Sequence, residues 1–346
     1  MGKHPTGIAR YAASLFHELT LIEDLDLQGL FPLSRITKSS NVTDISPMKF
    51  YSSIDMIKKR KLDLIHTTDF KVPHYFKNII STVHDVFLFT KEGSRFATKE
   101  FKKKKRKDLE SIISRSQHII TVSETTKIDL NKNFNVDLKN ISVTHLGIPS
   151  NLFEENATKP SSLDSFFSRP FLLFVGAISE RKNIESLIQA YSNSRARKDY
   201  NLILVGHLSS GSEKSLDLVK KLNLGEKVFF LQHVSDIDLI NLYDQSSGLV
   251  FPTYYEGFGI PPLEAMARKK PVLAGNRGAT KEVLGNNLYY CDPHELDSIQ
   301  EGIEKLCDFP KDWIELNYNH AKSYTWSKTA ISTFDVYKKT IERGLK

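Results

Sequence analysis

Short apolar runs that alternate with helical stretches are the feature that most constrains how this chain of 346 residues can fold. In the second half the predicted strands are Phe171–Ala177, Asn201–Gly206, Val228–Gln232, Gly248–Pro252 and Pro271–Ala274, and a helical stretch follows each of them. Unbroken apolar runs of this length are typical of parallel strands that are buried on both faces. The second half therefore predicts a parallel sheet built from βαβ units.

The first half repeats this alternation. Its predicted strands are Leu27–Pro32, Leu62–His66, Asn78–Val86, His118–Ser123 and Ile141–Gly147. Its predicted helices are an opening amphipathic helix with Tyr11, Leu15, Leu19 and Ile22 on one face, a helix near Asp55–Arg60, and a basic helix at Ala97–Ser114. The sequence thus predicts an α/β protein with two Rossmann-like domains that face one another across a cleft, residues 1–155 and 170–323. The Ser-, Pro- and Asn-containing stretch 156–169 is the predicted linker.

Composition is that of an ordinary soluble globular protein, with 40% hydrophobic and 26% charged residues. No apolar run approaches a membrane span, and the N-terminus has no signal-peptide core. The only cysteines are Cys291 and Cys307, which fits a reducing cytoplasm. The net charge of +7 falls entirely in residues 1–170, where 26 Lys and Arg face 19 Asp and Glu, whereas the remainder has 22 of each. We therefore expect a cytoplasmic protein whose first half attracts negative surfaces.

The stretch Tyr254–Leu263, closed by Glu264, carries the clearest functional signal. It follows a predicted strand, is broken by Gly257 and Gly259, and runs into the helix Pro261–Ala267. Glycines allow close approach of the backbone, and a helix N-terminus favours an anion. A carboxylate at each end of the loop, Glu256 and Glu264, instead suits hydroxyl groups, which donate charge-assisted hydrogen bonds. A ligand that is anionic in the middle and rich in hydroxyls at both ends has the shape of a sugar nucleotide.

The letters E-G-F-G-I-P-P-L-E-A-M-A resemble the E-x7-E signature of retaining glycosyltransferases of the GT-B fold, family 4. The resemblance implies that Glu256 addresses the hydroxyls of the transferred sugar and supports charge at the reacting centre. Glu264 is expected to accept hydrogen bonds from the ribose hydroxyls. It also implies that the C-terminal helix, residues 324–346, crosses back to the first domain. Backbone N–H groups for the sugar and phosphate would come from Gly257, Phe258, Gly259 and Ile260.

Two cations follow the first strand of the second half, in Gly176–Asn183. Lys182 matches the phosphate-binding lysine of the family, and Arg181 is its expected partner in a diphosphate clamp, because an arginine binds phosphate in a forked manner. Some relatives carry an arginine directly after the glycine, where this chain has Ala177. The alternative is a pair of solvated charges, although cations are disfavoured at a helix start.

Further residues are expected at the site from their places after strands or at a helix start. His84 ends an apolar strand, and a family histidine at this place lines the reacting centre; the alternative is a structural histidine. Gly7 is expected to touch the donor phosphate or the acceptor. Val234 is expected to meet the nucleotide base through its backbone, unless the neighbouring Ser235 merely caps a helix. The resemblance implies no cofactor and no metal ion, because basic residues and a helix end stabilise the diphosphate.

The run Lys102–Lys107 (KKKKRK) lies in the basic helix. Such runs are usually solvated faces, but basic residues near an anionic leaflet also add binding energy, about 1 kcal/mol each. Together with the uneven charge of the two halves, the run predicts a peripheral contact with anionic membrane at the cytoplasmic face.

The resemblance implies transfer of a hexose from a nucleoside-diphosphate sugar with retention of configuration. The stretches TGIARY and VHDV look most like bacterial transferases of surface-polysaccharide synthesis, so we expect GDP-mannose as donor and a polyprenyl-diphosphate-linked saccharide as acceptor. The family's usual path is front-face attack, in which the leaving phosphate takes the acceptor's proton. The first apolar strand of the family is absent ahead of the opening helix, which predicts a start assigned too late or a sheet completed by another segment.

Four other functions stay open. A GT-B-fold sugar-nucleotide epimerase would use similar loops without an acceptor site. A nicotinamide-dependent dehydrogenase would need a G-x-G-x-x-G motif with a following acidic residue, and none appears after a strand. A nucleic-acid binder would fit the basic run but would need aromatic stacking motifs. If the first strand is truly lacking, a catalytically dead scaffold is also possible.

Overall fold

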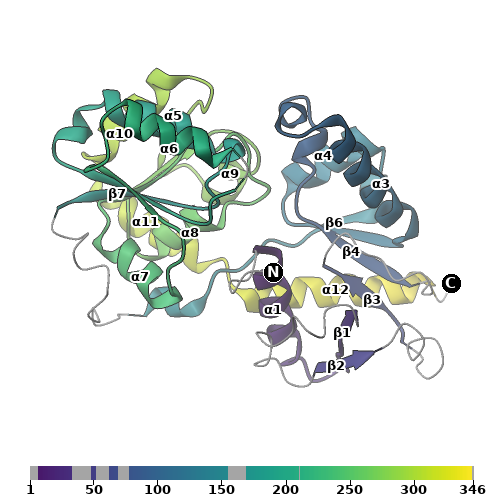
Figure 1. Ribbon diagram of the computed structural model, residues 1–346. Helices are drawn as coiled ribbons and strands as arrows, with labels where there is room; N and C mark the ends of the chain where they lie inside the picture. Colours follow the sequence, from purple (N-terminus) through teal and green to yellow (C-terminus); the bar gives the residue numbers. More distant parts are fainter. Residues whose placement is uncertain are drawn as a thin grey trace. The chain divides into compact units, whose positions relative to one another are not determined.

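The computed structural model describes residues 7–32, 48–51, 62–68, 78–154, 169–209 and 211–344. The chain divides into two compact units (Figure 1). One unit combines Met1–Gly147 with Thr325–Lys346, and the other is Ile148–Tyr324. The division falls at Ile148, ahead of the predicted linker, most of which lies outside the described residues.

The second unit is built on a six-stranded parallel sheet in the order β12-β11-β10-β7-β8-β9. The strands are β7 (Phe171–Val175), β8 (Asn201–Val205), β9 (Val228–Leu231), β10 (Gly248–Phe251), β11 (Val272–Gly275) and β12 (Tyr289–Cys291). Because β10 pairs with β7 and not with β9, the strand order reverses between β7 and β10. In a doubly wound sheet, ligands bind outside the carboxyl ends of the strands at such a reversal.

The predicted apolar runs form the centre of this sheet. Every residue of β8, β10 and β11 is buried, as the absence of polar alternation predicted. The strand β12 is new relative to the sequence prediction. It is an edge strand of only three residues, two of them half-buried tyrosines, so it lacks the apolar run that identified the others.

Helices cover both faces of the sheet in the second unit. They are α5 (Ile184–Asn193), α6 (Ser212–Lys221), α7 (Asp236–Gln245), α8 (Ile260–Ala267), α9 (Thr280–Leu284), α10 (Leu296–Leu306) and α11 (Lys311–Lys322). Figure 1 shows α5, α6 and α10 on one face and α7, α8 and α11 on the other. The sheet is therefore the middle layer of a three-layer α/β sandwich.

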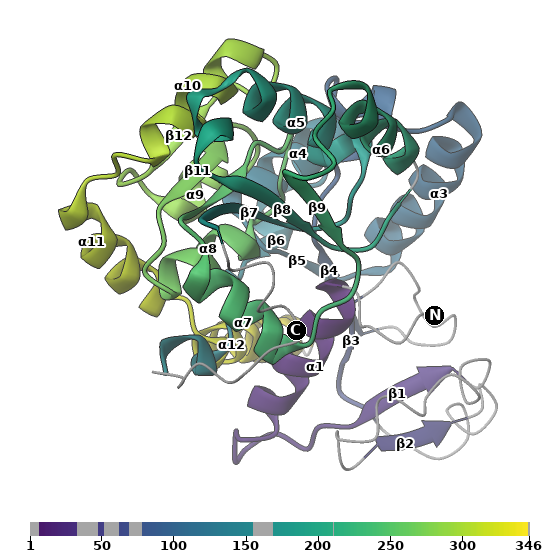
Figure 2. The same ribbon diagram turned by 60° about the vertical axis from the view of Figure 1, so that its left-hand side comes forward.

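The first unit holds a four-stranded parallel sheet in the order β3-β4-β5-β6. Its strands are β3 (Ile65–Thr67), β4 (Ile79–Val83), β5 (His118–Thr121) and β6 (Ile141–Val143). A separate parallel pair joins β1 (Gly29–Pro32) and β2 (Met48–Tyr51), which Figure 2 shows side by side. The predicted helix Asp55–Arg60 and everything ahead of Gly7 lie outside the described residues, so the expectation about a first strand stays untested.

Four α-helices are described in the first unit: α1 (Gly7–Leu19), α3 (Lys99–Arg115), α4 (Glu124–Phe134) and α12 (Trp326–Gly344). The buried residues of α1 are Tyr11, Leu15 and Leu19, as its periodicity predicted, whereas Ile22 lies beyond the helix end. The last helix, α12, belongs to this unit and packs beside α1, which confirms the predicted crossing of the chain's end.

A network of polar side chains joins α1, β3, β4 and α12 inside the first unit. The hydroxyl of Thr82 lies 3.0 Å from the Tyr11 hydroxyl and 2.7 Å from Nε2 of His66. The other ring nitrogen of His66, Nδ1, lies 2.7 Å from the hydroxyl of Tyr337. Burial, reinforced by the charge of nearby His84, lowers the pKa of His66 from its ordinary 6.5 to about 3. His66 is therefore neutral at physiological pH.

This pKa predicts a specific pH dependence of stability. As the pH falls below 6.5 the unfolded chain binds a proton at His66 that the folded chain rejects until about pH 3, so stability is lost with falling pH. Replacing His66 by Asn removes this contribution. We expect His66→Asn to destabilise the protein at pH 7, because hydrogen bonds are lost, and the gap to the wild type to narrow by about 2 kcal/mol at pH 5. Urea unfolding at the two pH values measures the gap; an equal gap at both would contradict the assignment.

Candidate functional site

The reversal of strand order brings together residues that are far apart in the sequence. The segment after β7 contains a short 3₁₀ turn, Glu180–Lys182, and the segment after β10 contains Glu256. Nζ of Lys182 lies 2.6 Å from Oε1 of Glu256, and the two side chains are 12% and 10% exposed. The structure thus places Lys182 and Glu256 in contact at the edge of the sheet where doubly wound folds bind ligands.

The charges at this edge support one another. Burial by itself would raise the pKa of the Glu256 carboxyl, but the positive charges of Lys182 and Arg181 outweigh that effect and hold its pKa below the ordinary value. The ammonium group of Lys182 also lies 5.2 Å from the ring centroid of Phe251, the last residue of β10. Glu256 is therefore an anion at neutral pH, and Lys182 is its neighbouring cation.

The backbone around Glu256 is tightly held. Its carbonyl accepts a hydrogen bond from the N–H of Ala279 at 2.9 Å. Gly278 has a φ of +67°, and a Cβ added there would lie 2.4 Å from the Glu256 carbonyl oxygen. Only glycine fits that approach. The loop after β11 therefore fixes Glu256 by direct backbone contact.

A buried asparagine connects the loops at this edge of the sheet by hydrogen bonds. Asn183, directly after the 3₁₀ turn, is 3% exposed and has a left-handed backbone with φ +61°. Its side-chain amide donates to the carbonyls of Pro252 at 3.0 Å and Pro293 at 2.7 Å. The N–H of Tyr254 donates to the carbonyl of Arg181 at 3.3 Å. The segments after β7, β10 and β12 are thus cross-linked, which limits the movement of Lys182.

The glycine loop leads into α8 as predicted, but its helix start offers few donors. Gly259 precedes the helix with φ +103°, a conformation that favours glycine. The following residues are Ile260, Pro261 and Pro262, and a proline has no N–H. Of the first three helical residues only Ile260 carries an amide hydrogen, so an anion there would rely on the loop's own N–H groups.

The side chain of Phe258 is buried and is not presented to a ligand. It is 4% exposed, and its ring packs edge-on against Tyr324 with 5.8 Å between centroids. Only the backbone of Phe258 is left for the predicted contact. Glu264 lies further along α8 and is 7% exposed, and its Oε2 accepts a hydrogen bond from the hydroxyl of Tyr243 at 2.8 Å. Nothing in the local sequence marks Tyr243 as a site residue, because a tyrosine within a helix is usually a core residue.

A second interaction between α7 and α8 was also missed. Arg268, just after α8, binds Asp244 through both arms of its guanidinium group, with Nε–Oδ1 and Nη2–Oδ2 distances of 2.6 Å. Its Nη1 donates to the carbonyls of Leu152 and Glu154 at 2.9 and 2.7 Å. Arg268 thereby holds the segment that opens the second unit against the end of α8. A lone Arg and a lone Asp in neighbouring helices carry no spacing signal in the sequence.

The predicted residues of the first half lie in the first unit. Gly7 is the first residue of α1; it is exposed, and a Cβ added there would meet nothing within 4 Å. His84 directly follows β4, and its ring packs edge-on against Tyr11 at 4.7 Å between centroids. The next residue, Asp85, accepts a hydrogen bond from the N–H of Phe87 at 3.2 Å. The roles of Gly7 and His84 stay predictions.

Ser235 is the N-cap of α7, because its hydroxyl accepts the N–H of Asp238 at 3.0 Å. The capping interpretation is thus confirmed for Ser235, and the contact of the half-buried Val234 with a base stays a prediction. Ser123 similarly caps α4 by accepting the N–H of Thr126 at 3.1 Å. Among the described residues, no group of three or more His, Cys, Asp or Glu side chains is placed to hold a metal ion.

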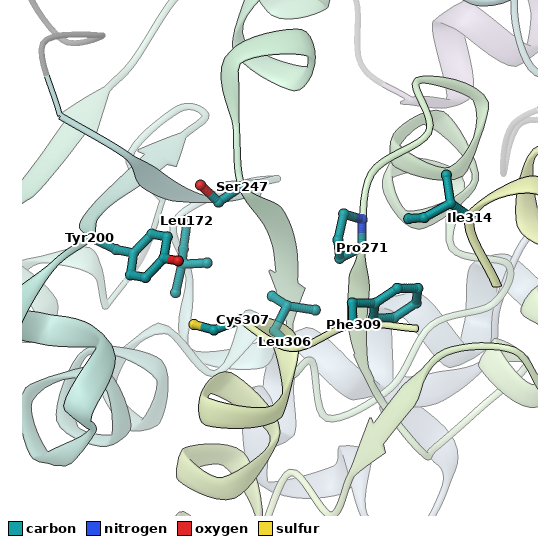
Figure 3. A pocket seen from close by; sticks show the side chains of 8 residues that line it. All are labelled: Leu172, Tyr200, Ser247, Pro271, Leu306, Cys307, Phe309 and Ile314. Carbon is teal, nitrogen blue, oxygen red and sulfur yellow. The ribbon is translucent and has the colours of Figure 1, made fainter. Parts of the chain in front are cut away.

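A hollow of about 220 Å³ lies elsewhere in the second unit (Figure 3). Its lining includes Leu172 near the start of β7, and Ser247 and Pro271, which directly precede β10 and β11. It therefore opens at the amino edge of the sheet, opposite to Lys182 and Glu256. None of the predicted site residues lines it.

Comparisons with known proteins cover nearly the whole chain. Residues 5–152 match the family model described as Glycosyltransferase Family 4, and residues 157–322 match Glycosyl transferases group 1. The chain is 30% identical to the O-antigen chain mannosyltransferase RfbU of Salmonella typhimurium, over 90% of each protein. It is 26% identical to O-antigen chain mannosyltransferase B of Escherichia coli, over 97% of each.

Solved structures share the fold at lower identity. A glycosyltransferase from Rickettsia africae superposes with a TM-score of 0.74 at 19% identity, covering 98% of this chain and 97% of the other. HepE from Anabaena, solved in complex with UDP-glucose, gives a TM-score of 0.74 at 15% identity over 98% of both chains. These likenesses show that the chain shares the fold of those proteins, with two parallel-sheet α/β units.

Proposed function

Because this chain belongs to the family 4 glycosyltransferases, we propose that it transfers a mannosyl residue from GDP-mannose to a saccharide acceptor with retention of configuration. The observation that carries the proposal is the Lys182–Glu256 pair at the reversal of strand order. The names of the two O-antigen mannosyltransferases support mannose as the transferred sugar and a surface polysaccharide as the product.

The site chemistry fits departure of a diphosphate. When the bond between the sugar and the phosphate breaks, negative charge grows on the leaving oxygen, and a preorganised cation stabilises it. The ammonium group of Lys182 has three N–H donors, of which the contact with Glu256 uses one. We infer that the ammonium charge of Lys182 stabilises a phosphate oxygen while the contact with Glu256 holds Lys182 in place. Arg181 adds positive charge beside them.

The carboxylates of Glu256 and Glu264 would bind the two hydroxyl-rich ends of the donor, the transferred sugar and the ribose. Glu256, ionised and fixed by Lys182, would accept hydrogen bonds from hydroxyls of the transferred mannose and support the positive charge that develops at its anomeric carbon. Glu264 would accept hydrogen bonds from the hydroxyls of the ribose. In the proposed front-face path the acceptor hydroxyl gives its proton to the departing phosphate oxygen, so no separate base is required. The proposed acceptor is a polyprenyl-diphosphate-linked saccharide.

A donor screen tests the proposal. We expect GDP-mannose to raise the melting temperature more than UDP-, ADP- or dTDP-sugars, because a ligand that binds only the folded protein adds about 2.7 kcal/mol at 100 times its Kd. Glu264→Gln should lose most of that shift, whereas Glu213→Gln, at an exposed position of α6, should keep it.

With a lipid-linked acceptor, NMR of the product should show the anomeric configuration of the donor. No nucleotide preference, or an epimer formed from donor alone, would contradict the proposal.

We also propose that α3 contacts an anionic leaflet, where a lipid-linked acceptor would be met. Lys103, Lys104 and Lys107 are exposed on α3, and Phe101 beside them is 46% exposed. Arg106 is engaged within the unit instead, with its guanidinium group 4.6 Å from the ring centroid of Phe134 and 3.5 Å from the carboxylate of Glu110. No helix in the described part of the chain is long and apolar enough to cross a membrane.

The three exposed lysines of α3 give the membrane test. Replacing Lys103, Lys104 and Lys107 by Gln should weaken binding to phosphatidylglycerol vesicles about 100-fold, since each lysine near an anionic surface adds about 1 kcal/mol. The matched control is the triple Gln variant of Lys198, Lys220 and Lys221, which are exposed in the second unit. Vesicle sedimentation at fixed salt measures both. Equal vesicle binding by the two variants would contradict the proposed contact between α3 and the anionic leaflet.

A further inference from the structure

The buried hydroxyl of Tyr243 is aimed at the carboxylate that the proposed function assigns to the ribose. Tyr243 lies in α7 and has no exposed surface. Its hydroxyl donates to Oε2 of Glu264 at 2.8 Å, and the next acceptor, the Pro261 carbonyl, is at 3.4 Å. A hydroxyl bonded to a carboxylate makes a charge-assisted hydrogen bond, which is stronger than a neutral one.

The neighbouring residue of α7 makes a second fixed contact with α8. Asp244 holds Arg268 by the forked pair of 2.6 Å contacts. Glu264 and Arg268 are four residues apart, so they lie on the same side of the chain one helical turn apart. Tyr243 and Asp244, which are consecutive in α7, thus contact Glu264 within α8 and Arg268 just after its end. The register between the two helices stays fixed by the Arg268 pair even when the Tyr243 hydroxyl is removed.

We propose that Tyr243 is a positioning residue for nucleotide binding: it fixes Oε2 of Glu264 so that the carboxylate is oriented toward a ribose hydroxyl of the donor. A carboxylate has about four acceptor positions, so the hydrogen bond from Tyr243 does not by itself exhaust them. Without that bond the Glu264 side chain loses one constraint, and ordering it when the ligand binds costs more rotational entropy. This inference rests on the proposed function, in which Glu264 binds the ribose.

The first experiment compares two tyrosine hydroxyls in the same unit. Tyr243→Phe should raise the Kd for GDP about tenfold and the donor KM similarly, with kcat at saturating donor unchanged within about twofold, because the lost contact acts on binding. Tyr191→Phe is the matched control. Tyr191 is equally buried, and its hydroxyl donates to the carbonyl of Tyr200 at 2.7 Å, so the same group is deleted away from Glu264. It should lower stability and leave both constants unchanged.

The second experiment asks whether the effect passes through the ribose. Isothermal titration of GDP, 2′-deoxy-GDP and 3′-deoxy-GDP should show, in the wild type, a loss of affinity for the form that lacks the hydroxyl bound by Glu264. In Tyr243→Phe that loss should shrink, because two changes that act on one contact are not additive. A merely structural role of Tyr243 would lower stability and leave the two losses additive. If Tyr243→Phe does not fold, Tyr243→Met fills the space without a donor and replaces it.

The outcomes separate this inference from the proposed function. If Glu264→Gln leaves GDP affinity unchanged, the assignment of Glu264 to the ribose fails, and the inference fails with it. If Glu264→Gln weakens GDP binding but Tyr243→Phe behaves like Tyr191→Phe, the proposed function stands and the positioning role of Tyr243 is overturned.

Discussion

The ion pair between Lys182 and Glu256 is the interaction on which the rest of the site depends. Each side chain is largely withdrawn from solvent, and a buried charge without a partner is strongly destabilising. The pair therefore fixes how the segment after β7 lies against the segment after β10. Those segments come together because the strand order reverses between β7 and β10, so the chemistry follows from the topology of the sheet.

The glycines at the carboxyl edge show how closely these segments are packed. A Cβ on Gly206 would lie 2.0 Å from the carbonyl oxygen of Gly176, and a Cβ on Gly275 would lie 2.5 Å from that of Thr253. With Gly278 against Glu256, the backbone after β8 and β11 approaches the segments that carry Lys182 and Glu256 without intervening side chains. Such packing preorganises charged groups before a ligand arrives, which is where electrostatic stabilisation of a transition state is most effective.

Much of the fold could be predicted from the sequence, because burial on both faces leaves an unbroken apolar run. Phe171–Val175 and Asn201–Val205 were recognised in this way, whereas the edge strand Tyr289–Cys291 was not. Strand ends were less accurate: the strand expected at Leu62–His66 begins at Ile65. Polar flanking residues and short length weaken the periodic signal at an edge, and pairing with a neighbour decides the boundary.

The site residues, too, could be predicted only where the local sequence pattern is distinctive. The glycine loop, Glu256 and Lys182 stand out by their local pattern, and the structure brings Glu256 and Lys182 into contact. The link from Tyr243 to Glu264 could not be predicted, because it joins two helices across the packed interior and neither residue has a local signature. Pairing of this kind depends on helix register, which the sequence of a single helix does not specify.

The most direct test of the central claim compares GDP with guanosine on a protein whose ion pair has been neutralised. In the double variant Lys182→Gln/Glu256→Gln two amides replace the pair, so no buried charge is left alone. If these loops bind the diphosphate, titration calorimetry should show GDP affinity reduced about 100-fold or more, as expected for loss of a charge-assisted phosphate contact, with guanosine affinity unchanged. Equal GDP affinity in the wild type and the double variant would contradict the account.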